Sequence, residues 1–222
     1  VLNRFFQVGD FRSGYYRDQT IMMAQGHLDP EKLFAAIYAH PDIKKEPMSA
    51  GRQMVGHFSN TLVDENGIWL DQTQSKNHVS DVSCTGAQMP RLIGLAQASK
   101  IYRSLKIKNA HKFSNNGNEI AWGTIGNAST SEGLFFEAIN AAGVLQIPMV
   151  MSVWDDGYGI SVDNKQQTTK ESISKALEGF AREKDMGIEI LTVKGWDYSA
   201  LIKTYSYASK IAREKHTPVL VH

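Results

Sequence analysis

The second half of the chain alternates between continuous apolar runs and stretches in which apolar residues recur every three or four positions. Residues 120–125 and 149–154 are apolar runs of the length and composition of buried strands. Similar runs at 188–193 and 219–221 predict two more strands. Strands that are separated by helices usually form a parallel sheet with helices on both faces. We therefore expect an α/β fold with a mostly parallel sheet.

The stretches between these runs predict helices. The first helix is expected to begin near Ser131, with Ser131 and Glu132 as capping groups. Its apolar stripe comprises Leu134, Phe135, Ala138, Ala141, Ala142 and Leu145. Two later stripes, in residues 173–181 and 201–212, predict the helices between the remaining strands.

The first 81 residues show less periodicity. A helix is predicted to begin at Asp29 and Pro30 and to end before Pro41. Residues 48–81 are rich in Gly, Ser, Asn and Gln, and the pair at 66–67, Asn-Gly, is a turn signal. We expect a long ordered loop or a small hairpin in this segment.

Small and polar residues follow the two predicted strands that flank the first helix. Gly126, Asn127 and Ala128 follow one strand, and an acidic turn that includes Asp156 follows the other. Parallel strands end at the same edge of a sheet, so these turns should lie side by side. Backbone N–H groups at a helix start favour phosphate oxygens, and amide, carboxylate and carbonyl oxygens suit magnesium. The sequence predicts a site for a diphosphate and its cation, with a plain solvated turn as the alternative.

Five motifs resemble one known family. The GNA turn and the WDD turn are spaced like the thiamine diphosphate motif. The segments TSEGLFFEAINAA and DDGYGIS are similar to the alpha-type chain of the decarboxylating dehydrogenase component of 2-oxo acid dehydrogenase complexes. The YRD sequence at 16–18 and the segment SCTGAQMPRLIGLAQASK at 83–100 resemble two further blocks of this family, in the same order. The resemblance implies the thiamine diphosphate-binding fold, of which this chain is the diphosphate-binding domain.

The resemblance also implies roles for individual residues. Tyr16 and Arg17 would hold the diphosphate, because a guanidinium meets phosphate through two parallel hydrogen bonds. Ser83 and Thr85 would meet the aminopyrimidine side of the cofactor. The positions that match the diphosphate and magnesium site are Gly126, Asn127, Ala128, Asp156 and Tyr158, with Asn127, Asp156 and the Tyr158 backbone as metal ligands.

A histidine in the predicted loop is a weak candidate for catalysis. The segment GRQMVGHF at 51–58 is more similar to the branched-chain type of the family than to the pyruvate type. Its His57 is a candidate for the substrate channel. A lone loop histidine is more often structural or merely exposed, and we favour that interpretation.

Three positions depart from the family pattern. The metal aspartate and asparagine of the family are exchanged here, as Asn127 and Asp156. Because the exchange conserves charge and oxygen count, we expect magnesium binding to survive. Trp154 stands where many members have an arginine, and Asp155 is an additional carboxylate that binds metal, repels phosphate or faces solvent. Without the arginine contact we expect cofactor binding to be weaker by roughly 1.5 to 3 kcal/mol, unless another basic residue replaces it.

The leading hypothesis is the diphosphate-binding half of a thiamine diphosphate-dependent 2-oxo acid dehydrogenase. The substrate is expected to be a branched-chain 2-oxo acid, with pyruvate as the second choice. The resemblance implies a beta-type chain or fused beta-type domain that supplies a glutamate, and an acyltransferase component whose lipoyl arm accepts the acyl group. It also implies a histidine-bearing loop after His222, and a homodimer or heterotetramer. A non-catalytic assembly subunit and an acetoin-cleaving thiamine enzyme remain as alternatives.

Composition narrows the choice of partners and compartment. The formal net charge of +1 predicts no general attraction to nucleic acid or to a membrane surface. The single cysteine excludes an internal disulfide and favours a reducing compartment, either cytoplasm or mitochondrial matrix. No apolar stretch has the length of a membrane span. We expect one domain over 1–222, with an irregular part at 1–81 and a Rossmann-like core at 82–222, within a longer or two-chain enzyme.

Overall fold

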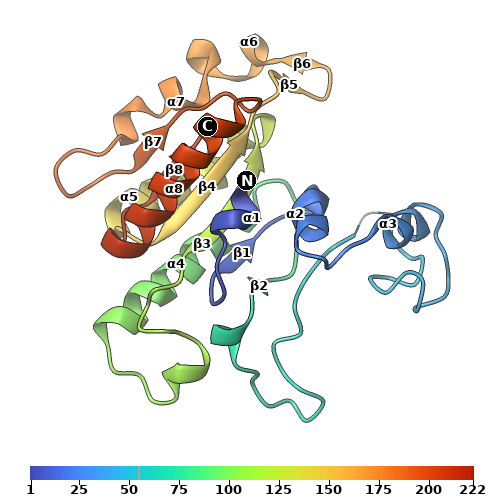
Figure 1. Cartoon of the computed structure of the whole chain (residues 1–222). Helices are drawn as coiled ribbons and strands as arrows, with labels where there is room; N and C mark the ends of the chain where they lie inside the picture. Colours follow the sequence, from blue (N-terminus) through green and yellow to red (C-terminus); the bar gives the residue numbers. More distant parts are fainter. Residues whose placement is uncertain (55) are drawn as a thin grey trace.

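The centre of the protein is a parallel sheet of six strands (Figure 1). The structure is a computed structural model that describes residues 1–54 and 56–222, so Val55 of the GRQMVGHF segment lies outside the described residues. The strands, in the order in which they lie in the sheet, are β2 (Asn77–His78), β1 (Phe11–Ser13), β3 (Ala121–Gly126), β4 (Met149–Trp154), β8 (Val219–Val221) and β7 (Glu189–Leu191). The predicted α/β fold with a mostly parallel sheet is confirmed.

Strands β3 and β4 form the middle of the sheet and run in register along their whole length. Ala121 pairs with Met149 at one end, and Gly126 pairs with Trp154 at the other. Every residue of β3 is buried, which explains its continuous apolar run, because a central parallel strand is covered on both faces. The two strands therefore end side by side, as the sequence predicts.

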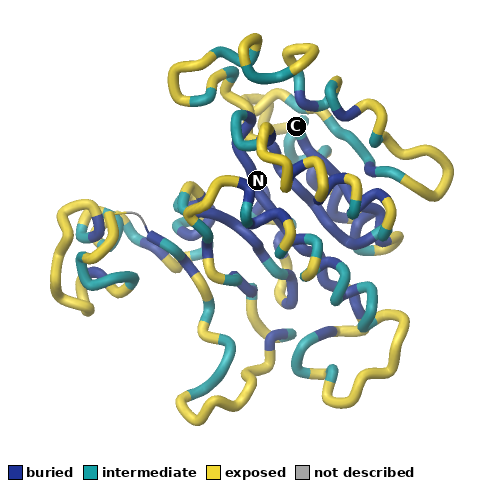
Figure 2. Tube along the Cα trace, turned by 180° about the vertical axis from the view of Figure 1, so that it is seen from behind, coloured by how far each residue is buried: buried dark blue, intermediate teal, exposed yellow. Residues whose placement is uncertain are grey.

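Helices cover both faces of the sheet (Figure 1). One face packs against α4 (Gln88–Ser104), α5 (Gly133–Leu145) and α7 (Ile173–Ala176). The opposite face packs against α1 (Leu2–Phe5), α2 (Gln19–Ala24) and α8 (Tyr198–Lys215). Helix α3 (Pro30–Ile37) begins with Asp29 as its cap, as predicted, and its segment is mostly exposed in Figure 2.

Three details of the predicted helices are wrong. Ser131 ends a 3₁₀ turn, Ala128–Ser131, and the N-cap of α5 is Glu132, which makes no capping bond through its side chain. Leu134 is 37% exposed, whereas the predicted Phe135, Ala138 and Ala142 are buried together with Ile139. The helix predicted over residues 173–181 divides into α7 and a 3₁₀ turn at Glu178–Phe180, after which the chain becomes extended to bridge Ile188.

The less regular segments contain two hairpin-like turns. An isolated antiparallel bridge joins Val63 to Trp69 around the predicted turn at 66–67. A second, unpredicted hairpin consists of β5 (Tyr158–Gly159) and β6 (Val162–Asp163), followed by α6 (Asn164–Gln167). The division of the chain at residue 81 stays a prediction, although β1 and β2 of the N-terminal part belong to the same sheet as the core. Among the described residues, no helix combines the length and apolarity needed to cross a membrane.

A buried charged cluster joins the N-terminal part to the sheet. The guanidinium of Arg12 contacts Asp18 Oδ2 at 2.5 Å and Asp81 Oδ1 at 2.6 Å, and its Nε donates to His78 Nδ1 at 2.9 Å. Asp18 also accepts a bond of 2.5 Å from the hydroxyl of Thr124 on β3. Buried charges are tolerated only when they are paired and hydrogen-bonded in this way. Because Asp18 directly follows the Tyr16–Arg17 pair, the cluster fixes that turn against the sheet.

This cluster makes the stability of the fold depend on pH. Burial, and to a lesser extent the charge of Arg12, lowers the pKa of His78 from 6.5 to about 3. Below pH 6.5 the unfolded chain therefore binds a proton at this residue that the native state does not bind, so stability falls as pH falls. We expect His78 to cost about 2 kcal/mol of unfolding free energy at pH ~5 relative to neutral pH.

Chemical unfolding at both pH values measures this effect. The His78→Gln variant should lose about 2 kcal/mol less than the unmodified protein between neutral pH and pH ~5. Equal losses in the two proteins would show that His78 does not remain neutral in the native state.

Candidate functional site

The candidate site lies where β3 and β4 end. The backbone N–H of Asn127, directly after β3, donates to the Trp154 carbonyl at 3.2 Å. The Asn127 side chain is buried, and its Nδ2 donates to the carbonyl oxygen of Tyr158 at 3.0 Å. Two of the predicted metal ligands, the Asn127 side chain and the Tyr158 backbone, are thus in direct contact.

Asp156 lies on the other side of Tyr158. Its Oδ1 accepts a bond of 3.1 Å from the Tyr158 N–H, and the residue is exposed. Asn127 and Asp156 therefore contact the same residue from two directions, one from the buried edge of the sheet and one from the surface. Their shared role as metal ligands stays a prediction.

The predicted diphosphate residues lie over the start of the GNA turn. The guanidinium of Arg17 donates to the Tyr16 hydroxyl at 3.1 Å and lies 5.5 Å from the centroid of that ring. A Cβ added to Gly126 would lie 3.7 Å from the Tyr15 hydroxyl and 3.8 Å from Arg17 Nη1. The bond with Tyr16 first, and the charge of Asp156 to a smaller extent, raise the pKa of Arg17. Arg17, Gly126 and the acidic turn therefore form one neighbourhood, and Tyr15 is a member that the sequence did not indicate.

The hairpin after β4 packs directly on the GNA turn. A Cβ added to Gly159 would lie 2.5 Å from the Ala128 side chain and 2.2 Å from Gln167 Nε2. Only glycine allows so close an approach. The contact packs the hairpin against Ala128, next to Asn127, and the part of Ala128 in cofactor binding stays a prediction.

The predicted aminopyrimidine residues lie in the loop before α4. Ser83 and Thr85 are both exposed, and the Ser83 hydroxyl is 2.5 Å from His57 Nε2. A Cβ added to Gly86 would lie 3.1 Å from the Glu132 side chain at the start of α5. The structure thus brings the weak catalytic candidate His57 to the loop that carries the predicted cofactor residues.

A cavity of about 320 Å³ lies beside His57. Its apolar lining includes the side chains of Met22, Leu28, Met48 and Phe58, three of which form a separate hydrophobic cluster. His27 and His78 also line the cavity, and burial lowers the pKa of both. The walls therefore combine an apolar side with polar groups, among them Lys32 and Asn60, and His57 lies between the cavity and Ser83.

Asp155 is bonded to protein groups. Its Oδ1 accepts from the Gly157 N–H at 2.7 Å and from Asn164 Nδ2 at 3.0 Å, and its Oδ2 is 2.8 Å from His222 Nε2. Burial tends to raise the pKa of Asp155, but the bonds from His222, Gly157 and Asn164 outweigh it and lower the pKa. The carboxylate of Asp155 is therefore held by three neighbouring protein groups, and its effect on metal or phosphate stays a prediction. Asn164 and His222 gave no signal in the sequence.

The oxygen atoms at the ends of β3 and β4 are suitable ligands for a hard cation such as magnesium. Within the described part of the chain, no cluster of three or more His, Cys, Asp or Glu side chains is arranged to hold a metal. The predicted set instead combines an amide, a carboxylate and a carbonyl, which magnesium accepts. Magnesium–oxygen bonds of 2.0–2.1 Å place neighbouring ligands about 2.9 Å apart. The 3.0 Å between the Asn127 amide and the Tyr158 oxygen fits, once a half-turn of the amide presents Oδ1 in place of Nδ2.

Comparison with protein families decides the relationship. Residues 3–222 match the family described as "Dehydrogenase E1 component". The chain belongs to this family. The "2-oxoisovalerate dehydrogenase subunit alpha" of Bacillus subtilis (strain 168) is 27% identical, over 96% of this chain and 53% of that protein. The mitochondrial "Pyruvate dehydrogenase E1 component subunit alpha" of Dictyostelium discoideum is 24% identical, over 93% of this chain and 44% of that protein.

These relatives confirm the resemblance to an alpha-type chain of this E1 family. The chain spans about half the length of the curated relatives it matches. A transketolase crystal structure from Pichia stipitis is similar in fold, with a TM-score of 0.50 and 19% identity over 70% of this chain and 21% of that one. That likeness agrees with the expected thiamine diphosphate-binding fold.

Proposed function

We propose that this E1-family chain is the thiamine diphosphate- and magnesium-binding half of a 2-oxo acid dehydrogenase. The observation that carries the proposal is the contact of 3.0 Å between the Asn127 side chain and the Tyr158 carbonyl, with Arg17 over Gly126 beside it. This contact supports a magnesium site beside the guanidinium of Arg17, which would bind phosphate, at one edge of the sheet.

The residues have distinct roles in this proposal. Arg17 and Tyr16 hold the diphosphate, and Asn127, Asp156 and the Tyr158 carbonyl hold magnesium. Ser83 and Thr85 meet the aminopyrimidine side. When bound, the cofactor supplies the electron sink for decarboxylation. The chain itself neutralises the diphosphate and fixes its orientation.

The cavity beside His57 is proposed to take the side chain of the substrate. Its apolar lining from Met22, Leu28 and Phe58 suits an aliphatic group. His57 lies between the cavity and the loop of Ser83, where its ring can donate to a polar group of the substrate. A branched-chain 2-oxo acid fits this lining better than pyruvate. The name of the Bacillus subtilis relative supports this choice.

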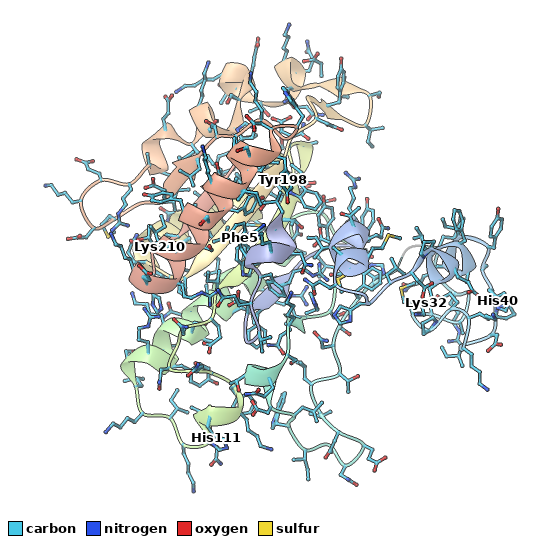
Figure 3. All side chains as sticks on the ribbon, in the orientation of Figure 1. Phe5, Lys32, His40, His111, Tyr198 and Lys210 are labelled. Carbon is cyan, nitrogen blue, oxygen red and sulfur yellow. The ribbon has the colours of Figure 1, made fainter. Side chains whose placement is uncertain are left out.

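A beta-type chain or domain is proposed to complete the site. The edge of the sheet around the site exposes large side chains, namely Trp154, Tyr158, Ile160, Trp196 and Tyr198. Figure 3 shows Tyr198 at the start of α8, at the same end of the sheet as the β5–β6 hairpin. Exposed aromatic residues are typical of interfaces. The assembly would be a homodimer or heterotetramer in cytoplasm or mitochondrial matrix, with a lipoyl-bearing acyltransferase component as acceptor.

A decarboxylation assay tests the proposed function. The full-length protein, with its beta-type partner, thiamine diphosphate and Mg²⁺, should release carbon dioxide from 3-methyl-2-oxobutanoate. Its kcat/KM for this acid should exceed that for pyruvate about 10-fold or more, because the extra methyl groups would pack on the apolar side of the cavity. No carbon dioxide from either acid at saturating cofactor would contradict the proposal, and a preference for pyruvate would contradict the assignment of the cavity.

A further inference from the structure

Asn164 connects the predicted cation site to Asp155. It is the first residue of α6, six positions beyond Tyr158. Its Oδ1 accepts a bond of 2.7 Å from Asn127 Nδ2, and its Nδ2 donates to both oxygens of Asp155, at 3.0 Å and 3.2 Å. The family motifs gave this residue no role.

The surroundings of Asn164 fix which end of its amide faces the site. An ionised carboxylate only accepts hydrogen bonds, so Asp155 requires the nitrogen of the Asn164 amide. Asp155 is itself held by the Gly157 N–H at 2.7 Å and by His222 Nε2 at 2.8 Å. The other ring nitrogen of His222 is 3.0 Å from the Ser174 hydroxyl. The oxygen of Asn164 is therefore held toward Asn127.

Two oxygens from different segments converge on the end of the Asn127 side chain. The Tyr158 carbonyl is 3.0 Å away and Asn164 Oδ1 is 2.7 Å away. Both distances are close to the ~2.9 Å that separates neighbouring ligands in a magnesium octahedron. The Asn127 amide donates hydrogen bonds to both oxygens. A half-turn of that amide replaces its nitrogen with a third oxygen.

We propose that Asn164 is a further ligand of the cation, through its Oδ1, and that Asp155 positions it. The inference rests on the proposed function, because the cation is the one that would hold the diphosphate. It adds a neutral oxygen to a site in which Asp156 already uses Oδ1 to accept from the Tyr158 N–H. The acidic residue beside the motif thereby gains a role, as the group that orients this ligand.

Binding of Mn²⁺ tests the inference without an activity assay. Mn²⁺ accepts the same oxygen ligands as Mg²⁺, and its electron paramagnetic resonance signal measures the free ion. In the full-length protein with its beta-type partner and saturating thiamine diphosphate, Asn164→Ala should weaken Mn²⁺ binding about 10-fold or more. Asn164→Asp should bind Mn²⁺ at least as tightly as the unmodified protein, because it keeps an oxygen at this point. The matched control is Asn140→Ala on the exposed face of α5, which should change nothing.

The outcomes separate this inference from the proposed function. Unchanged Mn²⁺ affinity in Asn164→Ala would overturn the ligand role of Asn164 alone. Equal weakening in Asn164→Ala and Asn164→Asp would also overturn it, because it would show that only the bond to Asp155 matters. If the unmodified protein with thiamine diphosphate binds no Mn²⁺, both the inference and the proposed cation site fail.

Discussion

Replacing Gly14 with alanine is expected to lower the free energy of unfolding by about 3 to 5 kcal/mol, the cost of breaking a buried ion pair. An added Cβ at this position would lie 1.6 Å from Arg12 Nη1 and 2.1 Å from Asp18 Oδ2. Both side chains are almost fully buried, at 1% and 0% exposure, so neither can move into solvent. The methyl group would separate the pair and leave both charges without their partner.

Gly94, in the interior of α4, offers a matched control. A Cβ added there meets nothing within 4 Å. Gly94→Ala should therefore raise stability by roughly 0.5 to 1 kcal/mol, because alanine loses less backbone entropy in a helix. Denaturant unfolding of both variants measures the two effects. A Gly14→Ala protein as stable as the unmodified one would show that the Arg12 cluster does not hold the N-terminal part to the sheet.

The centre of the fold was predictable because burial on both faces leaves a continuous apolar run. Strand β4 was predicted to the residue, and β3 within one position. Strand β1, which lies between β2 and β3, escaped prediction because it has three residues and carries Arg12, whose charge is neutralised by Asp18 and by the distant Asp81. Strand β2 has two residues, and both are polar. Their positions depend on tertiary contacts that no local pattern contains.

The same distinction between local pattern and tertiary contact explains which residues of the candidate site could be predicted. Asn127 and the acidic turn could be predicted because each directly follows an apolar strand, and parallel strands end together. Asn164 and His222 could not, because their contacts with Asp155 join residues nine and sixty-seven positions apart. Tyr15 lies in the turn between Arg12 and Asp18, whose side chains form a buried ion pair. The contacts between site residues that are distant in the sequence could therefore be identified only from the structure.

Asp156→Ala is expected to weaken thiamine diphosphate binding about 100-fold or more. Mutation of a residue that only bonds to a metal ligand already lowers metal affinity 10- to 100-fold, and Asp156 is a predicted ligand itself. Asp156 is the one carboxylate among the three predicted ligands, so its removal leaves the cation with neutral protein oxygens only. It also removes a charge that acts on Arg17. Asp185→Ala, which changes an exposed acidic residue in a distant turn, is the matched control and should bind as the unmodified protein does.

The central claim is that a cation at the ends of β3 and β4 anchors the diphosphate. Calorimetric titration of the full-length protein and its beta-type partner with thiamine diphosphate, in Mg²⁺ and then in excess chelator, tests it most directly. The account predicts saturable binding in Mg²⁺ and its loss in the chelator and in Asp156→Ala. Equal binding with and without the cation, or no saturable binding in Mg²⁺, would contradict it.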